Sequence, residues 1–144
     1  MNKIMNMQIE LQDKLSKLNA SVANPSDLFD DNDTTAGDLY DYIRNNQFFL
    51  NEEITEIMEA LGDGSRDIHK QWSANYGPLR SRMLHNDFSD KDLAKLKEEA
   101  TDALCFMLNI CIALGINADN ITPEYKKVFH KNIKRIEARV GQNK

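Results

Sequence analysis

The chain has 144 residues, a hydrophobic fraction of 41% and a formal net charge of −5, which describe one acidic domain with enough apolar residues for a core. This balance excludes a disordered chain, and no apolar run reaches the ~18 residues of a membrane-spanning helix. It also argues against a nucleic-acid surface, which needs a basic face, but leaves room for a phosphorylated ligand held by local cations or a metal.

The N-terminal segment MNKIMNMQIELQDKL carries charges throughout and shows no signal-peptide pattern. Cys105 and Cys111 are six residues apart in an apolar segment, so on a helix they point in different directions and do not easily pair. We therefore expect a cytoplasmic protein with two free core cysteines and no contact with a membrane.

Apolar residues recur with helical spacing through most of the chain and strand signals are missing, which predicts an all-α protein. The first expected helix covers residues 4–22 and stops before Asn24-Pro25. The polar residues 26–37 are typical of a loop. A second helix is expected over residues 38–61, where apolar side chains form a good stripe.

A long connection over residues 62–88 follows, with short helical pieces at most. Ser89 fits the N-cap of a third helix over residues 90–115. The second half of this helix, ALCFMLNICIALGI, is apolar nearly all round, so it should be buried on all sides. Burial against a second subunit is the natural way to achieve this, which predicts a dimer core.

A fourth helix is expected over residues 123–140, with Thr122 as its N-cap. One face of this helix is basic, and Lys131, Asn132 and Arg135 are its candidates for a phosphate ligand. The alternative is a solvated basic face that balances an acidic chain.

Two carboxylate pairs flank the apolar stripes of the second and third helices: Glu53 with Glu56, and Glu99 with Asp102. Each pair is spaced by three residues and therefore shares a helix face. If the helices pack antiparallel, the four carboxylates can meet, and they cannot all stay ionised without counter-charge. Such oxygen ligands suit Mg²⁺, or Mn²⁺ in its place, with a polyphosphate completing the shell.

Other interpretations of the acidic pairs are weaker. A single ExxE is unremarkable in an acidic helical protein, and solvated faces are the alternative for both pairs. A di-iron bundle requires Glu-x-x-His, which neither pair has. Surroundings poor in His and Cys argue against zinc.

The long connection contains His69-Lys70-Gln71-Trp72, which offers a cation beside the single tryptophan of the chain. Trp72 could stack on or close over a nucleotide base, and Lys70 could bind the substrate. The alternative for Trp72 is a packing anchor within the loop.

These acidic motifs resemble the EExxE…ExxD signature of the all-α nucleoside triphosphate pyrophosphatases, the MazG-like and dimeric dUTPase superfamily. The dimeric dUTPase branch looks closest. The first helix carries LQDKL, similar to the LQDxLN segment of that branch, and HKQW resembles its Lys-x-Trp element. EEATDALCF resembles its second acidic helix, and the late Lys/Asn/Arg element is similar too. The likeness spans roughly residues 10–137.

The resemblance implies a single all-α domain over residues 1–144, a four-to-five-helix bundle assembled as a helical dimer or tetramer. It implies Mg²⁺-dependent hydrolysis between the α- and β-phosphates of a nucleotide, which releases a monophosphate and, in the MazG-like group, pyrophosphate. The residues that would hold the metal are Glu53, Glu56, Glu99 and Asp102. The catalytic candidates are Glu53 and Glu52. Glu52 would be a further metal ligand or would orient the attacking water.

Carried over to this chain, the substrate-binding residues would be Gln12, Lys70, Trp72, Lys131, Asn132 and Arg135. The two basic residues of the late element would grip phosphate oxygens, its Asn would contact sugar or phosphate, and Gln12 and Trp72 would contact or enclose the base.

The chain departs from the dUTPase pattern in ways that concern the base. Ser16 stands where that branch usually carries an Asn that helps define the nucleotide pocket, and Ile136 replaces a second late Asn. We therefore expect dUTP as first choice, with dCTP or a purine dNTP open. The alternative function is a non-catalytic helical interaction protein that dimerises through its third helix. The placement of acid on two helices and base on a fourth favours the enzyme.

Overall fold

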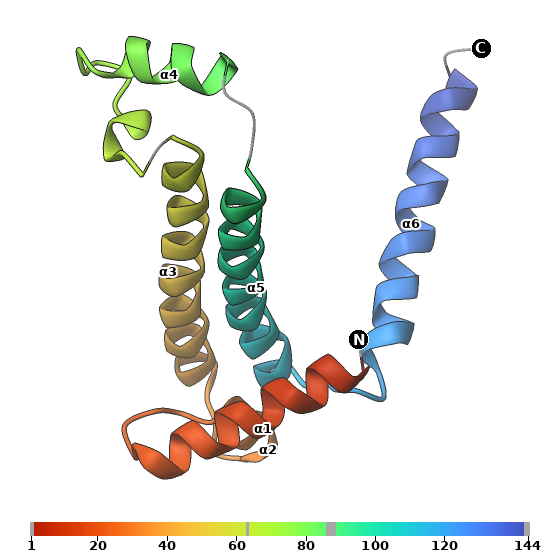
Figure 1. Ribbon diagram of the computed structural model, residues 1–144. Coiled ribbons are helices and arrows are strands. Elements are labelled where there is room, and N and C mark those ends of the chain that lie inside the picture. The colour runs from red at the N-terminus through yellow and green to blue at the C-terminus, as the bar shows by residue number, and fades with distance from the viewer. Residues whose placement is uncertain (1, 63, 86–88, 143–144) are drawn as a thin grey trace. The chain divides into compact units, whose positions relative to one another are not determined.

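The computed structural model describes residues 2–62, 64–85 and 89–142, and every regular element among them is helical (Figure 1). In chain order the elements are α1 (Asn2–Leu18), α2 (Pro25–Asp30), α3 (Ala36–Leu61), the 3₁₀ helix η1 (Arg66–His69), α4 (Tyr76–His85), α5 (Asp90–Ala113) and α6 (Ile121–Gln142). The all-α prediction is therefore confirmed for the described residues, while the bundle type and the oligomeric state remain predictions.

Contacts between residues divide the chain into two compact units, which we describe one at a time. The central unit is Thr35–Ile110, and the terminal unit combines Met1–Thr34 with Cys111–Lys144. The expectation of one domain over residues 1–144 remains a prediction. Across the described residues, no helix has the length and apolar character needed to cross a bilayer.

The terminal unit contains a short helix, α2, where the sequence predicted a loop. The side-chain oxygen of Asn24 caps this helix by accepting a hydrogen bond from the Ser26 N–H at 3.2 Å. Pro25 lies in the first turn, where a missing N–H leaves no helical bond unmade. The loop prediction was wrong over these residues because six residues are too few to show a helical period, so local capping decides their conformation.

Gly115 follows the end of α5 with a φ of +84°, in the left-handed region. A Cβ atom at this position would lie 2.5 Å from the ring of Phe29, which belongs to the same terminal unit. The backbone conformation and the lack of space therefore both require glycine here.

We expect Gly115→Ala to lower the free energy of unfolding by roughly 1–2 kcal/mol from backbone strain alone, with a further loss from the overlap with Phe29. Gly141→Ala is the matched control, because a Cβ there meets nothing within 4 Å and Gly141 lies in α6. It should leave stability unchanged or raise it slightly. Urea unfolding measures both variants, and equal stabilities would contradict this explanation.

α6 begins at Ile121, so Thr122 is not its N-cap and that prediction was wrong. The preceding turn is held by two asparagines: the Asn117 side chain accepts from the Asn120 N–H at 3.2 Å, and the Asn120 side chain accepts from the Asn117 N–H at 2.8 Å. This turn starts the helix earlier than Thr122. No residue of α6 is buried, so its apolar face is exposed in the single chain.

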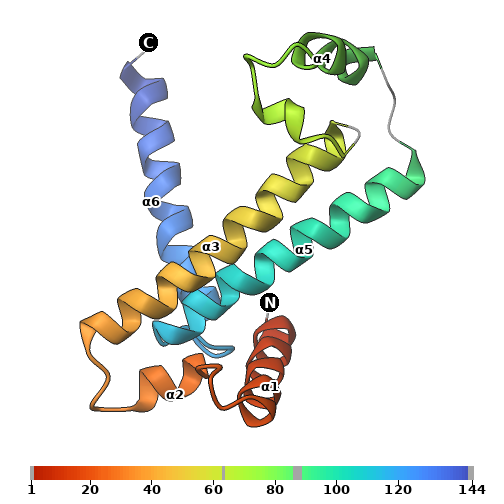
Figure 2. The same ribbon diagram turned by 90° about the vertical axis from the view of Figure 1, so that its left-hand side faces the viewer.

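The central unit is built around α3 and α5, which lie side by side and antiparallel (Figure 2). Thr35 caps α3 in a reciprocal box, in which its hydroxyl accepts from the Asp38 N–H and the Asp38 carboxylate accepts from the Thr35 N–H. The Ser89 hydroxyl accepts from the Asp92 N–H at 3.1 Å, as the sequence predicted for the start of α5.

Side chains of α3 and α5 meet along a line that we call the seam, formed by residues 46–53 and 99–109. The Asn109 amide donates to the Asn46 side-chain oxygen at 3.1 Å, and the rings of Phe49 and Phe106 stack with centroids 5.4 Å apart. From one contact to the next, the positions advance along α3 from 46 to 49 to 53 and go back along α5 by the same numbers of residues, from 109 to 106 to 102. This register brings Glu53 opposite the acidic pair of α5.

The second half of α5 is buried on one side only. Its buried apolar residues are Ala103, Leu108, Ile112 and Ala113, and its exposed ones are Leu104 and Met107. Both cysteines are free and half-buried, and burial raises the pKa of each thiol. The prediction of unpaired cysteines is confirmed, whereas burial of α5 against a second subunit remains a prediction.

The connection after α3 contains η1 and α4, the short helical pieces predicted for residues 62–88, of which 63 and 86–88 lie outside the described part. η1 packs tightly on the end of α3, because a Cβ on Gly62 would lie 3.1 Å from Ile68. The Glu59 carboxylate oxygen lies 3.4 Å from His69 Nε2, which ties η1 to the last turns of α3.

Candidate metal centre

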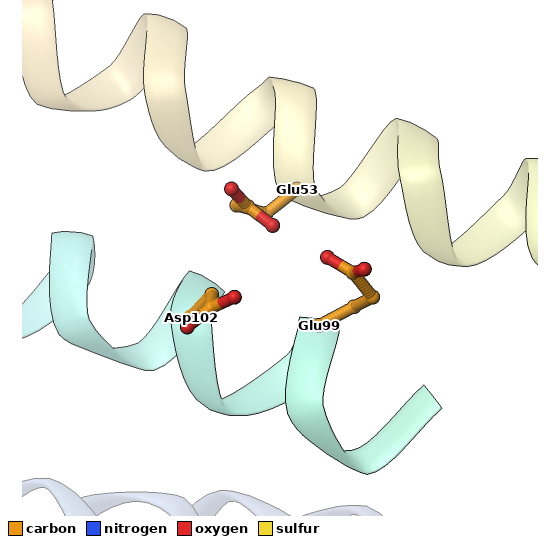
Figure 3. A group of neighbouring side chains, drawn as sticks. All are labelled: Glu53, Glu99 and Asp102. Atoms are coloured by element: carbon orange, nitrogen blue, oxygen red, sulfur yellow. The ribbon is translucent and has the colours of Figure 1, made fainter. Parts of the chain in front are cut away.

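Three carboxylates converge at the seam of the central unit: Glu53 from α3, and Glu99 and Asp102 from α5 (Figure 3). Each offers a carboxylate oxygen, and these three oxygens all lie within 4.8 Å of one another. We call these residues the acidic cluster. Helical spacing explains how α5 supplies two of them, since residues three apart share a face.

The local environment of Glu53 is unfavourable for a bare carboxylate. Its Oε2 is shielded from solvent and has no hydrogen-bond partner among the described residues. Glu53 and Glu99 are half-buried, whereas Asp102 is exposed. A buried oxygen without a hydrogen-bond partner costs free energy, so a hydrogen-bond donor or a cation beside it would stabilise the cluster.

Electrostatics point the same way. Burial, followed by the side chain of Glu99 and the charges of Glu56, Glu99 and Asp102, raises the pKa of Glu53 to about 7. The pKa of Glu56 is also raised, with the side chain of Glu99 as the largest cause. The cluster therefore resists full ionisation, as expected for carboxylates without counter-charge.

The donor set fits a hard divalent cation. Carboxylate oxygens are the ligands that Mg²⁺ and Mn²⁺ prefer, and such an ion would give the orphaned Glu53 oxygen a partner and offset the mutual repulsion. Of the four predicted ligands, Glu53, Glu99 and Asp102 are brought together, while Glu56 is exposed and lies outside the cluster. Glu52 is exposed on the same helix and adds to the field that raises the pKa of Glu56.

The predicted base and phosphate residues of the long connection are not part of the cluster. Lys70 and Trp72 follow η1 in the central unit, and both are exposed, Trp72 to 83%. The Lys70 N–H donates to the Asp67 carbonyl and ends η1. Trp72 is therefore no packing anchor within the single chain.

The remaining predicted substrate residues belong to the terminal unit. Gln12 is buried in α1, in line with the buried Met5 and Gln8. Lys131, Asn132 and Arg135 are exposed on α6. Their part in a site with the acidic cluster stays a prediction.

Two contacts at the seam were not singled out from the sequence: the Asn46–Asn109 amide pair and the Phe49–Phe106 stack. A signal existed for one of them. Asn109 interrupts the apolar run ALCFMLNICIALGI, and a polar side chain inside such a run usually has a specific partner.

No family model and no solved structure matches the chain. Curated proteins do match it. The chain is 28% identical over 135 residues to a dCTP pyrophosphatase of Enterobacteria phage T4, a match that covers 90% of this chain and 74% of the relative. It is 30% identical over 104 residues to a dCTP pyrophosphatase of Enterobacteria phage LZ5, which covers 68% of this chain and 58% of that protein.

A third relative, named DNA replication protein, also comes from Enterobacteria phage T4 and is 28% identical over 135 residues. This match covers 90% of the chain but only 32% of the relative, so the chain corresponds to about a third of that protein. The two pyrophosphatase matches and the all-helical fold agree with the resemblance carried by the acidic motifs. Together these findings fit an all-α NTP pyrophosphatase-like protein.

Proposed function

We propose that the protein is a Mg²⁺-dependent pyrophosphohydrolase that cleaves a deoxynucleoside triphosphate to the monophosphate and pyrophosphate. The observation that carries this proposal is the acidic cluster, three carboxylates within 4.8 Å of one another with one buried oxygen left without a partner. Two relatives named dCTP pyrophosphatase support the reaction type.

In this proposal the seam residues Glu53, Glu99 and Asp102 hold the ion, with Mn²⁺ as an alternative to Mg²⁺. When bound, such an ion supplies positive charge to the phosphates and lowers the pKa of a coordinated water. Glu56, one turn further along α3, would be a further ligand in the bound state. Glu52 would orient the attacking water.

The phosphate chain carries negative charge and needs cations in addition to the ion. Lys131 and Arg135 are four residues apart on α6, so they share a face and can bind neighbouring phosphate oxygens. Asn132 would contact the sugar or a phosphate. Lys70 and Trp72 would also bind the substrate, Trp72 through contact with the base.

The base of the substrate is a pyrimidine in this proposal. The names of the two relatives favour dCTP, while the resemblance to the dimeric dUTPase branch places dUTP first. Gln12, buried in α1, would contact the base with its amide, which can both donate and accept.

A homo-oligomer is the second part of the proposal. The side chains of α6 that face away from its basic side are apolar and exposed in the single chain: Tyr125, Val128, Phe129, Ile133, Ile136 and Val140. An apolar stripe on a helix with no buried residue is expected to be covered by a second copy. Sedimentation as a single-chain species at micromolar concentration would contradict this part.

A panel of deoxynucleoside triphosphates tests the activity. We expect the wild-type protein with Mg²⁺ to convert a pyrimidine dNTP to its monophosphate with one pyrophosphate per turnover, and to be inactive in EDTA. Chromatography of the nucleotides with a pyrophosphate assay distinguishes this from release of single phosphates. If every dNTP stays intact with Mg²⁺ and with Mn²⁺, the enzyme proposal fails and a non-catalytic interaction protein becomes the better account.

A further inference from the structure

A buried amide pair links α3 to α5 at the seam. Asn46 and Asn109 are only 6% and 5% exposed, and the Asn109 Nδ2 donates to the Asn46 Oδ1 at 3.1 Å. The Asn46 Nδ2 in turn donates to the carbonyl oxygen of Tyr42 at 3.0 Å. The Asn46 amide is therefore satisfied at both its oxygen and its nitrogen, in a site that excludes water.

This pair lies on the same line of contacts as the acidic cluster. Asn46 precedes Glu53 by seven residues, and Asn109 follows Asp102 by the same number, which is about two helical turns or ~10 Å on each helix. The Phe49–Phe106 stack fills the turn between them. The amides are thus too far from the carboxylates to bind the same ion, but both groups depend on the same alignment of α3 along α5.

Among the described contacts of the seam, this directional hydrogen bond fixes the register more strictly than the neighbouring apolar contacts do. Apolar side chains on two helices can slide by one turn and still bury similar area, because their contacts are not directional. The carboxylates of the cluster repel one another and so favour separation when no cation is bound. A slip of one turn would move α3 by ~5.4 Å along α5, further than the 4.8 Å that spans the cluster oxygens.

The amide pair penalises this slip, since it would leave two buried amides without each other. Buried polar pairs that set helix register are known devices in coiled coils. We propose that Asn46 and Asn109 are positioning residues that hold α3 and α5 in the register in which Glu53 meets Glu99 and Asp102. This inference rests on the proposed function for its consequence, the binding of a divalent ion, but the register itself can be measured separately.

The test replaces both amides together, because leaving one unpaired would only destabilise the protein. Asn46→Leu/Asn109→Leu should fold with unchanged or higher melting temperature, since an apolar pair replaces a polar one. Its affinity for Mn²⁺ should fall about tenfold, as expected if the binding-competent register becomes a minor population. Mn²⁺ well above the weakened dissociation constant should restore hydrolysis, because the ion selects that register.

Two controls separate register from stability. Leu108→Ala, at a position that is 3% exposed on α5, should lower the melting temperature and leave Mn²⁺ affinity unchanged at temperatures where both proteins are folded. Nuclear Overhauser contacts between the rings of Phe49 and Phe106 report the register without any metal. They should weaken in the leucine pair and persist in Leu108→Ala. If Asn46→Leu/Asn109→Leu does not fold, Asn46→Ala/Asn109→Ala replaces it in both measurements, because its smaller side chains cannot overpack the seam.

The proposal is overturned if the double variants keep both the wild-type Mn²⁺ affinity and the Phe49–Phe106 contacts. It is equally overturned if Leu108→Ala loses affinity as much as they do. A wild-type protein that binds no Mn²⁺ would instead contradict the proposed function, and the ring contacts alone would then decide whether the amide pair fixes the register.

Discussion

Glu53→Gln is expected to lower the rate of dNTP hydrolysis by more than about 100-fold, since even the outer-shell partners of a metal site cost 10–100-fold when removed. The same substitution should make the metal-free protein more stable, by about 1 kcal/mol, because it removes a half-buried carboxylate whose pKa is raised by burial first and then by its acidic neighbours. Opposite signs in activity and stability distinguish a functional carboxylate from a structural one.

Steady-state hydrolysis at saturating Mg²⁺ and thermal unfolding in EDTA measure the two effects. Glu98→Gln is the matched control, because Glu98 is exposed on α5 beside Glu99 and lies outside the acidic cluster. It removes the same charge from the same helix and should change neither activity nor stability greatly. Equal activity of Glu53→Gln and Glu98→Gln would show that the cluster is not the catalytic site.

The stability of the metal-free protein should fall as pH rises from about 5 to about 7.5. The pKa of Glu53 is about 7 in the folded protein against an ordinary 4.5, so between these values the folded state holds a proton that the unfolded chain has released. Because the folded state binds more protons, the free energy of unfolding decreases with pH in this window and levels off above it. The raised pKa of Glu56 acts in the same direction.

Mg²⁺ should reverse this trend. An ion that binds the ionised cluster of the folded state stabilises it by mass action, and it does so most above the pKa of Glu53, where no proton has to be displaced. Thermal unfolding from pH 5 to 8.5, with Mg²⁺ and with EDTA, measures the difference. The pH dependence of the stability of Glu53→Gln reports the titration of the other groups and is subtracted from that of the wild type. If both proteins show the same slope of stability against pH, Glu53 is not the group that titrates.

Much of the site follows from local rules that act on the sequence. Glu99 and Asp102 share a face because they are three residues apart on one helix, whatever that helix packs against. The start of α5 follows from Ser89, whose hydroxyl has the capping partner that its position predicts. The two acidic motifs beside two apolar stripes therefore pointed to Glu53, Glu99 and Asp102, which the structure brings together, while the metal-binding roles of all four predicted carboxylates remain predictions.

The register of the seam could not be predicted in the same way. An apolar stripe looks the same after a slip of one turn, so periodicity does not say which carboxylates of α3 lie nearest the acidic pair of α5. The contact that makes the difference joins Asn46 to Asn109, which are 63 residues apart in the chain. The sequence also did not predict the start of α6. The reciprocal hydrogen bonds between Asn117 and Asn120 start this helix before Thr122, although threonine has good capping propensity.

The central claim is that the three carboxylates at the seam bind a divalent ion. A Mn²⁺ titration followed by the electron paramagnetic resonance of the free ion tests this without relying on activity. We predict saturable binding by the wild-type protein and by Glu98→Gln, and at least tenfold weaker binding by Glu53→Gln, whose amide has lost the charge that attracts the ion. Identical binding by all three proteins, or none by the wild type, would contradict the claim.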